Sequence, residues 1–297
     1  MFTEVVMRYG RLSGMIAAFM TITTLITCYI IARVMHKYTN GLKWPFFSEI
    51  GRDTPAYYVF ISGLTTIAVT MCIVWFYNAI IQRCIIHELV EKACIQDKAK
   101  SLFRMSNISV ACVVLSSFGL PILSIYNTTY HRVHTTAAKW FFCLETIALF
   151  TNTYVSWKIY RFTIARSNSS GFFNEETELS VSHTSEECIK SRKRTYLIQV
   201  VALSIFAAAF LVYVVMGSFI DCQNLTINEC LELDLGNEYC TEKMRRDEIY
   251  TVLSNCKERF ALVQTVAVSQ LICILTLLGY GLSFLAHHST RNSTAYY

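Results

Sequence analysis

Six long apolar stretches limit what this chain can fold into more than any other feature of its sequence. They lie near residues 12–34, 57–82, 108–126, 137–157, 196–220 and 260–286. A bilayer's hydrocarbon core, about 30 Å thick, is crossed by roughly 20 apolar residues of helix. The chain is also 54% hydrophobic and only 16% charged, which is unusual for a soluble domain. The stretches therefore predict an all-α membrane protein in which residues 1–297 form a single six-transmembrane-helix bundle.

The distribution of charge predicts how this bundle is oriented. The first stretch is longer than the apolar region of a signal peptide and no small-residue cleavage site follows it, so we expect it to remain as a helix. An even number of spans places both termini on one side of the membrane. That side then receives 15 of the 26 Lys and Arg residues, and cytoplasmic loops are the ones enriched in these residues. We therefore expect cytoplasmic termini.

Four of the twelve cysteines lie in the polar loop before the last span, residues 221–259. An even number at irregular spacing predicts disulfide bonds, with three possible pairings, among Cys222, Cys230, Cys240 and Cys256. Disulfides persist in oxidising compartments, so we expect this loop to be luminal or extracellular. Glycosylation sequons begin at Asn127 and Asn224, and this topology places both on that same side.

Residues 44–55 join the first two stretches and have the least generic sequence in the chain. Pro45 and Pro55 restrict φ and lack an N–H, and Gly51 permits a tight bend. We expect a shaped cap rather than a helix, although an ordinary interfacial loop is the alternative. Its aromatic side chains suit the membrane–water boundary and its polar side chains the aqueous side: Trp44, Phe46 and Phe47 in the first group, and Ser48, Glu49, Arg52 and Asp53 in the second.

Glu145 lies inside the fourth stretch, where an ionised carboxylate costs about 3 kcal/mol. We expect the neutral acid, which can donate to a threonine of the first span or to Gln270 of the sixth. A proton or ion pathway is the alternative reading. His131 and His134 are three residues apart, but no cysteine or carboxylate stands at ligand spacing nearby, so we expect no metal site.

The segment 163–194 is rich in Ser, Thr and Glu and poor in apolar residues, which predicts a disordered cytoplasmic loop. It ends in a basic cluster formed by Lys190, Arg192, Lys193 and Arg194. Such a cluster can hold anionic lipids, at about 1 kcal/mol per basic residue. The alternative is a simple anchor that follows the positive-inside rule.

Motifs for catalysis or cofactor binding are missing from the sequence: it has no His-Glu-x-x-His, no Gly-x-Ser-x-Gly and no phosphate-binding glycine loop. We therefore expect neither an enzyme nor a cofactor. A transporter would show broken helices at matching positions in two halves, and only Pro121 offers a break. The expected partners are the lipid bilayer, including anionic lipids, and unidentified membrane or cytosolic proteins, with no nucleic acid.

Two regions of the sequence resemble the Frag/DRAM/Sfk family. The first is the pattern Pro45-x-x-Ser48-Glu49-x-Gly51, followed by Pro55, which is similar to the first luminal loop of that family. The second runs from the glycine-containing third span through residues 126–129 to His134 at the start of the fourth span. Together they cover roughly residues 30–160. The chain departs from the family pattern at Phe47, where isoleucine is usual, and at Ala56, where glutamate is usual.

The resemblance implies a six-helix membrane protein with cytoplasmic termini and no established catalytic centre. Members of the DRAM branch act in lysosomal or endosomal membranes and promote autophagy, which is our first expectation for this chain. Members of the Sfk-like branch act at the plasma membrane, where they help recruit phosphoinositide kinases and influence lipid organisation. That adaptor role is the alternative, and an ion channel or transporter that uses Glu145 is a third.

Overall fold

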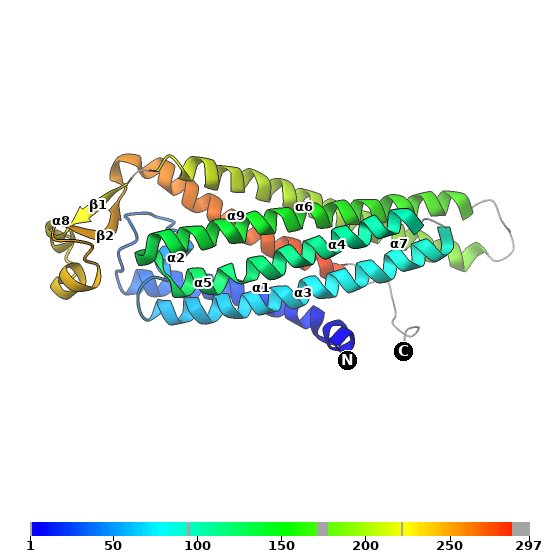
Figure 1. Cartoon of the computed structure of the whole chain (residues 1–297), viewed down its shortest axis with the longest axis horizontal. Coiled ribbons are helices and arrows are strands. Elements are labelled where there is room, and N and C mark those ends of the chain that lie inside the picture. Colours follow the sequence, from blue (N-terminus) through cyan, green and yellow to red (C-terminus); the bar gives the residue numbers. More distant parts are fainter. Residues whose placement is uncertain (1, 94–95, 171–177, 221, 287–297) are drawn as a thin grey trace.

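A computed structural model of the chain describes residues 2–93, 96–170, 178–220 and 222–286. In this part of the chain, six long helices run along one axis and a small two-stranded sheet closes one end (Figure 1). We call that end the loop end and the opposite one the far end. The long helices are α1 (Phe2–Val34), α3 (Ala56–Ala93), α4 (Gln96–Ser117), α6 (His131–Ser170), α7 (Glu178–Leu211) and α9 (Phe260–Ala286).

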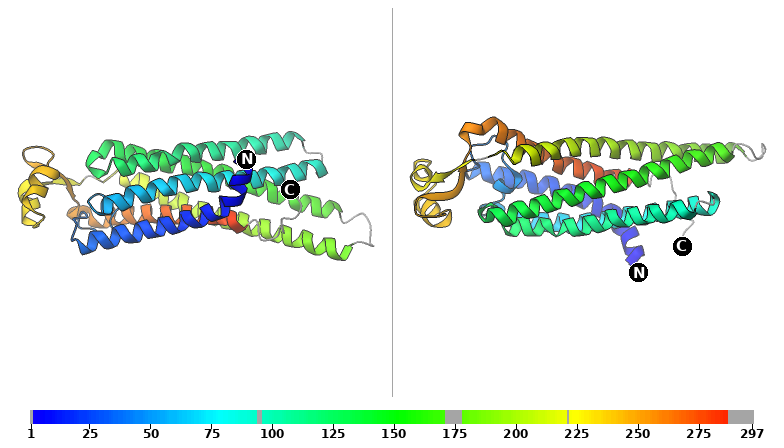
Figure 2. Two further views of the ribbon diagram at one scale, coloured as in Figure 1. Left: turned by 90° about the horizontal axis from the view of Figure 1, so that it is seen from below. Right: turned by 45° about the horizontal axis from the view of Figure 1, so that its top comes forward.

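Successive long helices pack side by side. The order of contact is α1, α3, α4, α6, α7 and α9, and α9 packs back against α1. Figure 2 shows these helices lying alongside one another over most of their length. They therefore form a closed ring, and the start of α1 and the end of α9 both point to the far end.

Most helices are longer than the apolar stretches that predicted them. The second predicted span ended near residue 82, whereas α3 continues to Ala93, and α4 begins at Gln96 rather than near residue 108. Charged and polar residues such as Lys, Glu and Gln favour helix almost as well as Leu does, so a helix does not end where its apolar run ends. The third span is interrupted at Phe118, before the short helix α5 (Gly119–Ile125). Pro121 explains the break because it has no N–H to donate to Ser117.

Five helices are long and apolar enough to cross a membrane, in the described part of the chain. Their spanning ranges are 6–34, 56–90, 99–125, 189–216 and 260–285. The predicted fourth span, residues 137–157, is helical as part of α6 but is not among the five. Glu145 and Asn152 lower its hydropathy, together with Lys139. Five spans are therefore supported by composition, and the sixth helix completes the ring by packing.

Two other predictions need correction. The segment 163–194 is helical up to Ser170 and again from Glu178, because Ser, Thr and Glu side chains do not exclude helix when neighbouring turns are already helical. Residues 171–177 lie outside the described part. The disulfide loop, residues 221–259, contains antiparallel strands β1 (Gln223–Thr226) and β2 (Tyr250–Asn255), so the described fold is not purely helical.

The two strands belong to a compact unit with its own small core. The unit also contains helix α8 (Ile227–Glu232), the π-helical turn η3 (Tyr239–Lys243) and two disulfides, Cys222–Cys256 and Cys230–Cys240. Its buried side chains include Leu225, Met244 and Leu253. The prediction that the four cysteines form disulfides is confirmed, and the pairing is one of the three that the sequence left open.

Candidate functional site

Residues 44–55, the cap segment, lie across the loop end of the bundle. A single helical turn, α2 (Phe47–Ile50), forms within it, so the expectation of no helix is wrong for these residues. The Phe47 N–H donates to Oε1 of Gln270 in α9 at 3.1 Å. Gln264, two turns earlier in α9, accepts from the Lys43 N–H at 3.0 Å and donates to the Trp44 carbonyl at 2.8 Å. Two glutamines of the last helix thus hold the cap segment in place.

Gly51 is needed for close packing rather than for a bend. Its φ is −95°, a value open to any residue. A Cβ added there would lie 2.4 Å from Cγ of Phe60 in α3, which is far inside van der Waals contact. The Phe60 ring in turn packs edge-to-face against Phe47 at 5.0 Å. The sequence-based explanation of this glycine is therefore corrected: Phe60 occupies the space that a side chain would need.

Arg52 is the centre of the cap segment. Its side chain is only 3% exposed and forms ion pairs with Glu49 at 2.6 Å and Asp53 at 3.3 Å. It also donates to the carbonyl of Tyr38, just after α1, at 2.7 Å. The expectation that these polar residues face water is wrong for Arg52, Asp53 and Ser48, which are buried. A buried charge is tolerated only when it is paired, and two carboxylates provide that pairing.

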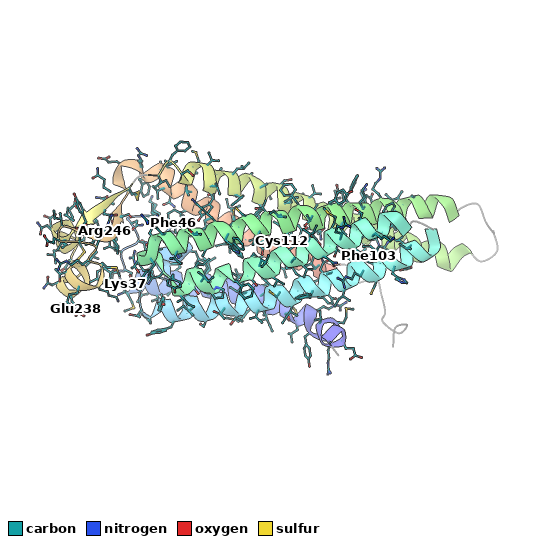
Figure 3. All side chains as sticks on the ribbon, viewed as in Figure 1. Lys37, Phe46, Phe103, Cys112, Glu238 and Arg246 are labelled. Carbon is teal, nitrogen blue, oxygen red and sulfur yellow. A yellow bond between two sulfur atoms is a disulfide. The ribbon has the colours of Figure 1, made fainter. Side chains whose placement is uncertain are left out.

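Tyr239 connects the Arg52 cluster to the disulfide loop. It precedes Cys240, lies 186 positions beyond Asp53 in sequence, and donates its hydroxyl to the Asp53 carboxylate at 2.9 Å. Arg52 donates to the same hydroxyl at 3.4 Å. A second link runs from the Tyr38 hydroxyl to the Ser254 carbonyl at 3.0 Å. The cap segment and the disulfide loop therefore meet on the same end of the molecule, and in Figure 3 Lys37 and Phe46 lie at their junction.

The electrostatics of the cluster favour its charged form. Burial tends to lower the pKa of Arg52, but the Glu49 carboxylate and then the groups of Tyr239 and Asp53 outweigh it, so the pKa is raised above its usual range. Burial also raises the pKa of the Tyr239 phenol, against the opposing field of Arg52. The cluster thus keeps a protonated guanidinium and a neutral phenol throughout the physiological pH range.

Two apolar cavities lie directly beneath the cap segment. The inner cavity, about 100 Å³, is lined by residues of α1, α2, α3, α5, α6 and α9, which include Phe60, Trp75 and Gly281. The lateral cavity, about 150 Å³, lies between α1 and α9 and is lined by residues that include Ile26 and Trp44. Phe47 and Gln270 line both cavities, so the cap segment forms the wall between them.

Polar side chains fill the bundle interior beyond the inner cavity. Asn152 in α6 accepts from Asn78 at 2.8 Å and from Gln82 at 2.9 Å, both in α3. It donates to the Tyr280 hydroxyl of α9 at 2.9 Å, and Ser106 of α4 donates to Gln82 at 3.1 Å. We call these five residues the polar network. It joins four helices in a region where an unpaired polar group is costly.

Glu145 is fully buried between α4 and α6 and lines neither cavity. Its Oε1 accepts from the Ser116 hydroxyl of α4 at 2.5 Å. The expected partners, a threonine of the first span or Gln270, are therefore wrong, because the ring order places α6 beside α4 and not beside α1. This contact joins two neighbouring helices.

Three other residues that the sequence analysis singled out, His134, Asn127 and Asn224, lie at the loop end. The His134 ring is buried, and its Nδ1 lies 2.8 Å from the Leu123 carbonyl at the end of α5. The side-chain nitrogen of Asn127, the atom that would hold a glycan, donates to the Arg52 carbonyl at 3.3 Å. Asn224 lies in β1 and is half-buried. In the described residues, no group of three or more His, Cys, Asp or Glu side chains is placed to hold a metal ion.

The four residues of the predicted basic cluster lie on α7 and differ in exposure. Lys190, Lys193 and Arg194 are exposed on α7, whereas Arg192 is half-buried and donates to the Thr163 hydroxyl of α6. Three of the four cations are thus available to a membrane surface or a partner, and the fourth joins two helices.

Sequence reasoning missed the residues that join the two regions of the loop end. The sequence marks Arg52 and Asp53 only as polar residues of the cap segment, and it gives no signal for Tyr38 or Tyr239. A charged triplet next to a proline was the one available signal, since Glu49, Arg52 and Asp53 fall within five positions. The partner tyrosines carry no such signal, because nothing local in the sequence brings position 239 to position 53.

The structure thus defines a multi-span helical membrane protein with a cap segment and a disulfide loop joined by a buried ion cluster. The chain belongs to the Frag1/DRAM/Sfk1 family: the family model described as Frag1/DRAM/Sfk1/Cwh43P N-terminal domain matches residues 11–290. The resemblance inferred from two regions of sequence is therefore confirmed over almost the whole chain. Comparisons with curated proteins and with solved structures give no match.

Proposed function

We propose that this protein is a non-enzymatic multi-pass regulator of the DRAM type, which acts in lysosomal or endosomal membranes and modulates autophagy. Membership of the Frag1/DRAM/Sfk1 family supports the proposal. The loop end supports a non-cytosolic location for this end of the bundle: two disulfides lie within the disulfide loop, and the Arg52 cluster joins that loop to the cap segment. Such a unit suits an oxidising compartment.

The proposed topology has six spans, with α6 as the fourth, and both termini in the cytoplasm. The closed ring supports it, since α6 packs between α4 and α7 and runs antiparallel to both, from the loop end to the far end. We expect a glycan at Asn224 and none at Asn127, whose side-chain nitrogen is already used. An enzymatic deglycosylation shift that persists in Asn127→Gln and disappears in Asn224→Gln supports this orientation. Absence of any shift in the wild type counts against it.

The organelle is tested by imaging a fluorescently tagged copy beside lysosomal and plasma-membrane markers. The same cells, with and without the protein, are assayed for autophagic flux. Co-localisation with acidic organelles and reduced flux after loss of the protein are the expected results. A signal confined to the cell surface, with unchanged flux, would reject the proposal.

The alternative is a plasma-membrane adaptor that organises phosphoinositide kinases or lipids. It is favoured by the three exposed cations of α7, which stand at one end of an apolar helix. Replacing Lys190, Lys193 and Arg194 with Gln should then disperse the kinase from the membrane. Arg192→Gln is the informative control, because this residue contacts Thr163 and its loss should affect packing rather than recruitment.

An ion channel has less support. Glu145 contacts Ser116 and lines neither cavity. Glu145→Gln keeps an acceptor for Ser116, so we expect normal folding and unchanged ion flux in reconstituted vesicles. A clear change in proton flux in this variant would revive the channel hypothesis.

A further inference from the structure

The two cavities beneath the cap segment are lined mainly by apolar side chains. The wall of the inner cavity is mainly apolar, and three of its polar side chains are already engaged: Oε1 of Gln270 accepts from the Phe47 N–H, Nδ1 of His134 lies against backbone carbonyls, and the Thr21 hydroxyl donates to the Ala17 carbonyl. Water needs two to four polar partners to occupy a cavity favourably. The space therefore suits hydrocarbon better than water.

The lateral cavity leads from the side of the bundle toward this space. Ile26 of α1 and Trp44 of the cap segment are 52% and 54% exposed, so the lateral cavity reaches the surface between α1 and α9. Both helices are apolar enough to span a membrane, and the surface at this place would face lipid chains. Trp44 stacks on Tyr29 with ring centroids 5.9 Å apart, an aromatic pair typical of the membrane–water boundary.

The volumes of the two cavities limit which molecules can bind in them. An engineered cavity of about 150 Å³ binds benzene, so the lateral cavity, about 150 Å³, has room for about six carbon atoms and the smaller inner cavity, about 100 Å³, for about four. Phe47 and Gln270 are the two residues that line both cavities. The Phe47 N–H donates to Gln270 of α9, and the Phe47 ring packs against Phe60 of α3. A chain that occupies both cavities therefore has to pass Phe47 and Gln270.

We propose that the cavities bind the hydrocarbon chain of a bilayer lipid, which enters between α1 and α9 and passes Phe47 into the centre of the bundle. The headgroup stays at the level of Trp44, and the chain end lies toward Gly281. The proposal rests on the cavities alone and holds for either organelle.

Photo-crosslinking tests this directly. Full-length protein is reconstituted in vesicles of phosphatidylcholine in which a small fraction of the lipid has a diazirine at the end of one acyl chain. After irradiation, labelled peptides are mapped by mass spectrometry. Adducts on inner-wall residues such as Ile274 and Leu277 are expected in the wild type. Adducts found only on outward-facing residues such as Leu275 would mean ordinary surrounding lipid and would overturn the proposal.

Glycines of α9 provide a matched pair of variants. Gly281 lines the inner cavity and Gly279 is exposed on the same helix, and a Cβ at either position would meet no atom within 4 Å. Gly281→Leu should reduce inner-wall labelling by roughly fivefold or more, because its side chain overpacks a site that a lipid chain occupies. Gly279→Leu should leave it unchanged. Equal labelling in the two variants contradicts the proposal.

A second pair tests the entrance without filling the inner cavity. Leu271 lines the lateral cavity, and Leu275 lies one turn further along α9 with a side chain 46% exposed. Leu271→Trp should lower inner-wall labelling, and Leu275→Trp should not. This pair decides the question if Gly281→Leu fails to fold, and the same labelling in both tryptophan variants would reject entry between α1 and α9.

Discussion

The two halves of the bundle interior are held together in different ways. Beneath the cap segment the interior is apolar and contains two cavities, whereas beyond Trp75 it is filled by the polar network. Trp75 marks the boundary, since it lines the inner cavity and also stacks on Tyr280 of the network at 6.1 Å. We call these the cap half and the network half.

The difference shows which interactions stabilise each half of the bundle. Helices in a membrane gain little from hydrophobic burial, so close packing and hydrogen bonds between helices hold them together. The network half has such bonds in its interior. The cap half has few, and its order comes from outside the bundle, through the Arg52 cluster, the disulfide loop and the two glutamines of α9. This arrangement leaves space inside the cap half.

Loss of Arg52 should have the largest effect and should be confined to the cap half. Arg52→Met leaves Glu49 and Asp53 buried without a cation, which costs about 3–5 kcal/mol of unfolding free energy. Denaturant titration of the purified protein measures this loss, and trypsin cleavage in the disulfide loop should become faster. The exposed Arg246 in the same loop is the control, and Arg246→Met should be close to neutral. Equal losses in the two variants would contradict the assigned role of Arg52.

Removal of the longer disulfide should come next. Cys222–Cys256 closes a separation of 34 residues and Cys230–Cys240 one of 10. By the chain-entropy relation, replacing the first pair with Ser should cost about 4 kcal/mol and replacing the second about 3 kcal/mol. Denaturant titration of both double variants gives the order. The reverse order would show that the disulfide loop is held mainly by its small core.

The network half should respond to Asn152→Ala with a smaller loss. The change leaves Asn78 and Gln82 without this acceptor and removes one of the donors to the Tyr280 hydroxyl, at an expected cost of about 1–2 kcal/mol. Phe150→Ala, at a residue of the same helix that is 52% exposed, is the control. Lipid labelling of the inner cavity should be unchanged by Asn152→Ala, and a strong change would show that the two halves are coupled.

Lowering the pH should have the smallest effect on stability, through the carboxylate of Asp247. The exposed Asp247 accepts from the N–H groups of Tyr250 and Ile249 at 2.7 and 2.9 Å, and these bonds lower its pKa below the ordinary 3.8. A lowered folded-state pKa means that the stabilisation is present at neutral pH and is lost only as the pH falls through that lowered value. The melting temperature should therefore show no Asp247-dependent change between pH 7 and pH 5. A difference between wild type and Asp247→Asn that disappears already at pH 5 would contradict this assignment.

Some of these features could be predicted from the sequence. The apolar stretches gave the long helices, and the even number of clustered cysteines gave the disulfides, because both signals are local and depend on residue type. The family was recognisable from Pro45, Ser48, Glu49 and Gly51.

The contacts that organise the site could not be predicted in this way. Gly51 is explained by the position of Phe60, and the partner of Glu145 by the order of helices in the ring. The Asp53–Tyr239 bond joins positions 186 apart, a pairing that only the folded chain defines. Each depends on which surfaces meet, and helix periodicity alone does not determine that.

The measurement that tests the account most directly is a double-mutant cycle between Asp53 and Tyr239. The free energy of unfolding is compared for wild type, Asp53→Ala, Tyr239→Phe and the double variant. If the cap segment and the disulfide loop form one unit around Arg52, the two changes should be coupled by about 0.5–3 kcal/mol. Effects that add within about 0.5 kcal/mol would show that the two regions are independent, and would contradict the account.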